Sequence, residues 1–245
     1  MTKSKVSIKL VAPVLMGFFV MSFCDLVGLG VDRVKLDFGL SNTLAQLIPS
    51  VVFLWFLILS VPVGILQDRL GKKTVLNLGI AITAIGLFIP FLFYSFEMVL
   101  IGFALLGIGN TIMQVSANPL LVDVVPSNRR SSFLSFSQFV KAVGSMIAAP
   151  LAGWFAVQYG DWKLLFIVFG VVSLLIFIWL STTKIEETKN TEQQATFTSS
   201  FKLLGNGYVS LMVLCVFMVV GIDVGVNTIS GQFLIEKFQS IQTLA

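Results

Sequence analysis

Long apolar runs dominate this sequence, and short polar stretches separate them. Seven of the runs have about 20 residues or more, which is the length that a helix needs to cross the hydrocarbon core of a bilayer. They predict an all-α membrane protein. The seven predicted spans are about Lys9–Val31, Thr43–Leu66, Val75–Phe96, Met98–Val122, Ser132–Tyr159, Trp162–Thr182 and Tyr208–Ile235.

The composition agrees with this pattern. Hydrophobic residues make up 56% of the chain and charged residues 11%, whereas about 25% of the residues of soluble domains are charged. The charged residues lie mostly in the predicted loops, and we expect Ser41 or Asn42 to cap the second span. The first outer loop is expected to contain four of the charged residues, Asp32, Arg33, Lys35 and Asp37.

One long polar segment divides the chain into parts. Residues 184–206 are rich in Glu, Thr, Gln and Ser, and they are typical of a flexible cytoplasmic linker between two membrane bundles. We therefore predict a six-helix bundle over 1–183, the linker, and the first helix of an incomplete second bundle over 207–245. A shift of 89 residues lays Gly64 on Gly153 and Gly71 on Gly160, which favours two three-helix repeats in the first bundle.

The distribution of basic residues predicts the orientation. Eleven Lys and Arg residues fall on the side of the N-terminus and four on the other side, and Lys141 lies inside a span. Cytoplasmic loops carry an excess of such residues. We expect a multi-pass protein of the cell inner membrane with its N-terminus in the cytoplasm.

The turn between the second and third spans, GILQDRLGKKT, carries a candidate gate. Its residues suit a latch between helix bundles, because a carboxylate can accept hydrogen bonds from a helix N-terminus and a glycine can reverse the chain with φ > 0. A basic loop that only sets the topology is the alternative. The gating residues that we name are Gly64, Asp68, Arg69, Gly71, Lys72 and Lys73.

Three charged residues lie inside predicted spans: Asp25, Lys141 and Asp223. A charge near the bilayer centre costs at least about 2.5–3.5 kcal/mol, so each one is a candidate functional residue. Lys141 lies about ten residues from the inner end of its helix, roughly 15 Å, which is too far for easy snorkelling. We expect it to pair with Asp25 beside a solute cavity; a purely structural ion pair is the alternative.

Amide side chains accompany these charges. Asn110, Gln114 and Asn118 share one face of the fourth span, and Gln138 shares a face with Lys141 on the fifth. Asn227 lies one turn beyond Asp223 on the seventh. Amides and a cation that converge from several helices suit a hydroxyl-rich or anionic small molecule. For Asn110 and Asn227, a hydrogen bond from helix to helix is an equally open interpretation.

The same inventory argues against other classes. The chain has no histidine, and its two cysteines, Cys24 and Cys215, lie in apolar runs. No span places a nucleophile next to a base, so we expect neither an enzyme nor a metal or cofactor site. No basic and aromatic interleaving indicates nucleic-acid binding. Any proton coupling must rest on carboxylates.

The turn at 64–74 resembles the G-x-x-x-D-R/K-x-G-R/K-R/K pattern of major facilitator superfamily transporters. The runs QVSANPLL (114–121) and LSFSQFVKAVGS (134–145) resemble the fucose permease branch of sugar:proton symporters, and Gln138 falls on a position implicated there in sugar contact. Two positions depart from that branch. Gln114 replaces an acid associated with proton coupling, and Lys141 replaces an asparagine.

The resemblance implies a secondary transporter that takes up a sugar or sugar-like solute by proton symport with alternating access. An anionic sugar acid or organic anion is as plausible as a neutral sugar, and a non-transporting membrane sensor or assembly partner is the alternative from another class. The superfamily fold needs twelve spans. We therefore expect this chain to be a truncated or partial transporter that lacks its C-terminal half.

Overall fold

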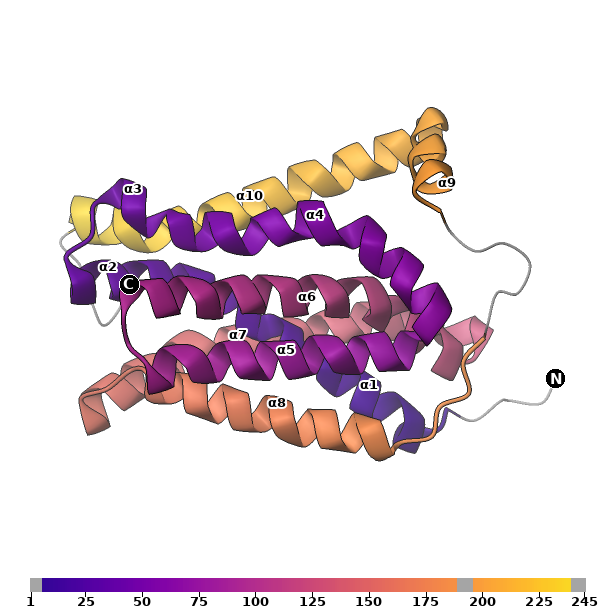
Figure 1. Ribbon diagram of the computed structural model, residues 1–245, viewed down its shortest axis with the longest axis horizontal. Helices are drawn as coiled ribbons and strands as arrows, with labels where there is room; N and C mark the ends of the chain where they lie inside the picture. The colour runs from indigo at the N-terminus through magenta and orange to yellow at the C-terminus, as the bar shows by residue number, and fades with distance from the viewer. Residues whose placement is uncertain (1–5, 189–195, 239–245) are drawn as a thin grey trace.

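The computed structural model describes residues 6–188 and 196–238, and there the chain is all-helical. Figure 1 shows the long helices lying side by side with their axes roughly parallel. Seven helical segments are long and apolar enough to cross a membrane, which confirms the predicted fold class. The helices are α1 Ile8–Met21, α2 Leu26–Phe38, α3 Asn42–Ala45, α4 Leu47–Leu70, α5 Lys72–Leu92, α6 Phe96–Val124, α7 Arg130–Tyr159, α8 Leu164–Thr182, α9 Phe197–Lys202 and α10 Gly207–Phe238, with short 3₁₀ turns η1 Ser22–Asp25, η2 Ser127–Arg129 and η3 Leu203–Gly205.

The first span differs from the prediction in two ways. It runs from Ile8 to Phe38, because the charged stretch expected in the outer loop forms the last turns of α2. It is also broken in the middle, where η1 separates α1 from α2. The following turn behaves as expected, since Gly39 ends α2 with φ +61 and the Ser41 hydroxyl accepts a hydrogen bond from the Leu44 N–H.

Glycines in the core of the bundle allow α5 to pack closely against α6. A Cβ on Gly79 would lie 2.9 Å from the Gly109 carbonyl oxygen, and one on Gly86 would lie 2.8 Å from that of Gly102. Backbones can approach this closely only where side chains are missing, which is a common way to hold membrane helices together. α4 joins the same core at Gly107, which faces the backbone of Val52.

A polar cluster ties the helices together at the end of the bundle opposite the N-terminus. One carboxylate oxygen of Asp37, at the end of α2, accepts hydrogen bonds from the Tyr94 hydroxyl at 2.5 Å and the Trp162 indole at 3.0 Å. The Lys163 ammonium lies 4.3 Å from the centre of the Tyr94 ring. Burial, together with the hydrogen bond to Asp37, raises the pKa of Tyr94 well above its usual value. The cluster joins α2 to the α5–α6 and α7–α8 loops.

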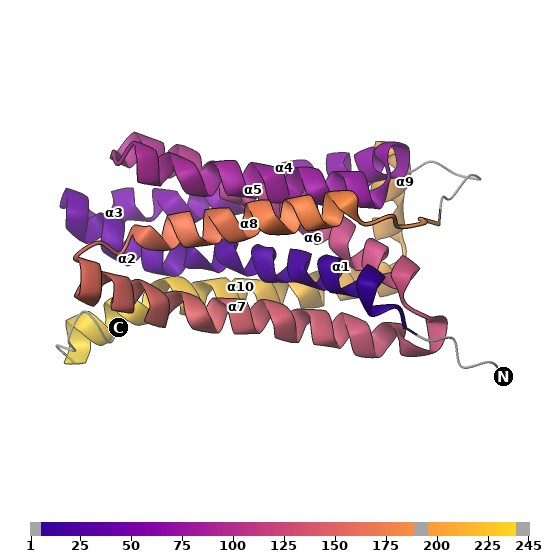
Figure 2. The same ribbon diagram turned by 90° about the horizontal axis from the view of Figure 1, so that it is seen from below.

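The seventh span stands apart from this bundle. α10 packs on α2, and no residue within Gly207–Val226 is buried. Figure 2, seen from below, shows α10 running along the side of the molecule that α7 also borders. The apolar surface of α10 is therefore available for lipid or for further protein.

The glycine packing makes a direct prediction for stability. Gly107→Ala would place a Cβ 2.5 Å from the Val52 carbonyl oxygen, and overpacking of this kind costs about 1–3 kcal/mol. We expect a lower free energy of unfolding in detergent, measured by denaturant titration. Gly153→Ala on α7, where a Cβ would meet nothing within 4 Å, is the matched control and should leave it unchanged. Equal stability of the two variants would contradict the packing account.

Candidate functional site

An ion pair lies in the middle of the bundle, at the break in the first span. The Lys141 ammonium on α7 is 3.8 Å from Oδ1 of Asp25, the last residue of η1. The two side chains are 26% and 31% exposed, so the pair is neither sealed in the core nor on the open surface. The structure thus brings together the two charges that the sequence analysis paired.

The second oxygen of Asp25 has a partner that the sequence analysis missed. The Ser145 hydroxyl donates a hydrogen bond to Asp25 Oδ2. Ser145 lies one helical turn beyond Lys141, so both residues face Asp25 from the same side of α7. The spacing of four residues could have identified Ser145 from the sequence, because a polar residue four positions from a membrane-buried lysine lies on the same helix face.

A close helix approach explains why these residues meet. A Cβ on Gly144 would lie 2.0 Å from the Ser22 hydroxyl oxygen in η1. Only glycine allows α7 to come this near to the broken segment. Gly144 therefore places its neighbour Ser145 against Asp25, which ends the same 3₁₀ turn.

The seventh span adds a second carboxylate. Asp223 on α10 is exposed, and it lies close enough to Asp25 for the two negative charges to repel each other. The site therefore combines residues from the first, fifth and seventh spans. Asn227, one turn further along α10, has a side chain outside the described residues.

The structure brings the predicted amides together only in part. Gln114 and Gln138 are exposed and Asn118 is half-buried, but among the described residues no hydrogen bond joins any of them to the ion pair. Asn110 is 4% exposed and lies near Cys24, so it faces η1 from α6, and its amide oxygen has no hydrogen-bond partner among the described residues. Within 6–188 and 196–238 no three potential metal ligands gather.

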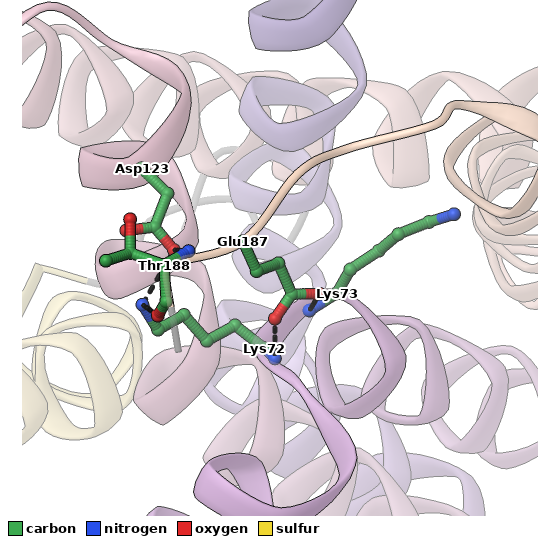
Figure 3. A network of polar contacts seen from close by, with 5 residues as sticks. All are labelled: Lys72, Lys73, Asp123, Glu187 and Thr188. Carbon is green, nitrogen blue, oxygen red and sulfur yellow. Dashed lines mark hydrogen bonds and ion pairs between the residues drawn. The ribbon is translucent and has the colours of Figure 1, made fainter. Parts of the chain in front are cut away.

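A second polar network lies at the predicted gating turn, at the end of the bundle that holds the N-terminus (Figure 3). α4 continues to Leu70, so Asp68 and Arg69 lie in its last turn, and Gly71 alone makes the reversal with φ +91. This confirms the positive φ predicted for the glycine of this turn. A Cβ on Gly64 would meet nothing within 4 Å in the described structure.

The start of the polar segment is bound to this turn rather than flexible throughout. The Glu187 carboxylate accepts hydrogen bonds from the backbone N–H groups of Lys72, at 2.5 Å, and Lys73, at 3.0 Å. It thereby caps the N-terminus of α5, where the helix dipole favours a negative charge. Sequence reasoning missed this contact, because nothing local distinguishes Glu187 from its neighbour Glu186.

The Lys72 side chain extends the network to α6. Its ammonium lies 2.6 Å from Asp123 Oδ2 and donates to the Thr188 carbonyl oxygen at 3.2 Å. The Thr188 N–H in turn donates to Asp123 at 3.3 Å. We call Lys72, Lys73, Asp123, Glu187 and Thr188 the linker clamp. It fastens the segment that follows α8 to α5 and α6.

Known proteins resemble this chain along most of its length. It is 28% identical over 192 residues to the cis,cis-muconate transport protein of Acinetobacter baylyi, which covers 73% of this chain and 45% of that protein. Over 126 residues, half of this chain and 30% of the relative, it is 32% identical to a glucose/galactose transporter of Brucella abortus. The chain spans about half the length of the first curated relatives that it matches.

The fold has solved counterparts as well. The crystal structure of a bacterial homolog of the human lysosomal transporter Spinster, in an inward-facing and unoccupied conformation, superposes with a TM-score of 0.74 at 20% identity. The match covers 99% of this chain and 58% of that one. The sequence pattern of the Major Facilitator Superfamily matches residues 13–240. The chain therefore belongs to the Major Facilitator Superfamily of membrane transporters.

Proposed function

We propose that this chain is the N-terminal half of a secondary active transporter that takes up a sugar or sugar-like solute by proton symport. The observation that carries the proposal is the Asp25–Lys141 pair, which is partly exposed in the middle of an apolar bundle and joined by Ser145. Charges at that depth are costly, and the residues that carry them usually mark the path of a solute or an ion. The motifs at 114–121 and 134–145 favour the fucose permease-like branch.

In this proposal six helices from α1/α2 to α8 form the first bundle, and α10 begins a second one that the rest of the protein completes. The two bundles rock about a site at their interface. Asp25, Gln114, Asn118, Gln138, Lys141, Asp223 and Asn227 are the residues that we assign to this site or to coupling. The excess of basic residues in the loops on the side of the N-terminus supports a cytoplasmic N-terminus, and we assign the protein to the inner membrane.

A second candidate substrate is an organic anion or sugar acid. Lys141 offers a positive charge at the site, and the relative from Acinetobacter is a transport protein for a dicarboxylic acid. The relative from Brucella transports neutral sugars by its name. Both substrate classes therefore have support among the relatives.

The gating role rests on the turn at Gly71 and the linker clamp. Glu187 holds the start of the polar segment against α5, directly beside the helix end that carries Asp68 and Arg69. A movement of the second bundle that pulls on this segment is transmitted to the turn. We infer that Gly64, Asp68, Arg69, Gly71, Lys72 and Lys73 gate the cytoplasmic side.

The transport proposal is tested by uptake into proteoliposomes. The test uses the complete transporter, meaning this chain together with the helices that follow it in the full-length protein. Lys141→Ala should reduce uptake at least tenfold with normal expression, because the site loses its cation and leaves Asp25 unpaired. Lys163→Ala is the matched control. The Lys163 ammonium lies 3.6 Å from the Asp161 carboxylate, and this ion pair does not belong to the site. Normal uptake by Lys141→Ala would contradict the assignment of the site.

The linker clamp is tested on the chain itself by limited proteolysis. Glu187→Ala removes a charge worth about 1 kcal/mol at a helix N-terminus, so we expect trypsin to cleave at Lys184 and Lys189 about five times faster. Glu186→Ala changes the neighbouring acid, for which no contact with the clamp is seen, and should cleave at the wild-type rate. If the two variants are cleaved equally fast, Glu187 does not hold the segment.

A further inference from the structure

The charges at the site do not balance. In the described structure Asp25 interacts electrostatically with Lys141 on α7, with Asp223 on α10 and with the adjacent Cys24. The other helices that pack on η1 carry their charged residues farther away. Those of α1 and α6 lie near the helix ends, and those of α2 begin about two turns beyond Asp25. These remote groups are Lys9, Glu97, Asp123, Asp32, Arg33, Lys35 and Asp37. Asp25 is therefore influenced by one ammonium and by one further carboxylate.

The ammonium is held loosely, and the carboxylate is held firmly. The Lys141–Asp25 distance is 3.8 Å, whereas Lys72 lies 2.6 Å from Asp123 in the linker clamp. Charge-assisted hydrogen bonds are usually about 2.7–2.9 Å long, so at 3.8 Å the lysine makes an ion pair without a full hydrogen bond. Asp25, in contrast, is fixed by the Ser145 hydroxyl. Lys141 is the member of the pair that can turn to a ligand.

We propose that the transported solute carries a carboxylate, which takes Lys141 from Asp25, and that Asp25 then accepts one proton. The inference rests on the proposed function and names the substrate class of the same site. A carboxylate matches the ammonium in charge, and it can approach because a quarter of the lysine side chain is exposed. A neutral sugar would leave the ion pair intact and would supply no reason for a proton to bind.

Uptake of a proton keeps the total charge of the site constant when the solute replaces Asp25 as the partner of Lys141. Before binding, Asp25 carboxylate and Lys141 ammonium neutralise each other. After binding, the solute carboxylate neutralises Lys141, and the Asp25 carboxylate is left without its cation beside the negative charge of Asp223. A carboxylate in that position is stabilised by taking up a proton from cavity water. One anion and one proton therefore enter together, and no net charge crosses the membrane.

The Ser145 hydroxyl suits both states. It donates to the Asp25 carboxylate in the unoccupied site, and a hydroxyl can accept from a protonated carboxyl after it rotates. Ser145 therefore keeps Asp25 in place while the lysine leaves. This separates the role of Ser145, which positions Asp25, from that of Lys141, which meets the solute.

The test measures uptake by the complete transporter in proteoliposomes with glucose and the monocarboxylates gluconate and glucuronate as probes. We expect uptake of a carboxylate and not of glucose, driven by an inward proton gradient and insensitive to a potassium–valinomycin potential. Uptake of glucose alone, or uptake that responds to the potential, would overturn the inference while leaving a transporter. No uptake of any probe would contradict the proposed function and remove the basis of the inference.

Two variants test whether Asp25 and Lys141 carry out this exchange. Solute binding is measured by thermal shift in the wild type and in each variant. Lys141→Ala should weaken carboxylate binding at least tenfold. Asp25→Asn should retain binding and abolish its pH dependence, which in the wild type is a weakening of carboxylate binding as the pH rises. Lys163→Ala and Asp161→Asn, which alter the outer ion pair, are the controls. Unchanged carboxylate binding by Lys141→Ala, or full pH dependence in Asp25→Asn, would overturn the proposal.

Discussion

An ion pair in the middle of an apolar bundle constrains much of this structure. Asp25 and Lys141 can be held there only if the backbone around them yields space and partners, since isolated charges at that depth cost several kcal/mol. The 3₁₀ turn at Ser22–Asp25, the glycine at 144 and the hydroxyl of Ser145 all meet at this point. A stretch of 3₁₀ helix in the middle of an α-helical span often marks a functional hinge.

The two ends of the bundle are stabilised differently from its centre. At the end opposite the N-terminus, Asp37 joins an aromatic cluster that ties three parts of the chain together. At the other end, Glu187 and Asp123 bind the backbone and the side chain of Lys72. At the centre, Asp25 accepts a hydrogen bond from Ser145 and forms a looser ion pair with Lys141, at 3.8 Å. Firm ends and a loosely bonded centre suit a bundle that moves as a unit and exchanges partners only at its site.

The sequence predicted the spans well, because an apolar run long enough to cross a bilayer has few other uses. It also predicted the Asp25–Lys141 pair, since an unpaired charge in a span is too costly. The break at Ser22–Asp25 could not be predicted, because the stretch contains neither proline nor glycine and depends on the packing of α7. The linker clamp was missed for a similar reason. Glu187 becomes distinct from Glu186 only through contacts with residues more than 100 positions away.

The measurement that tests the central claim most directly is the reactivity of a cysteine beside the ion pair. Ser145→Cys, in a complete transporter whose exposed Cys215 is replaced by serine, is treated with a water-soluble thiol reagent with and without transported solute. If the pair lies at a solute site, the cysteine is modified and the solute slows the reaction. A cysteine that is never modified, or that reacts equally fast with saturating solute, would show that Asp25 and Lys141 form a structural pair away from the transport path.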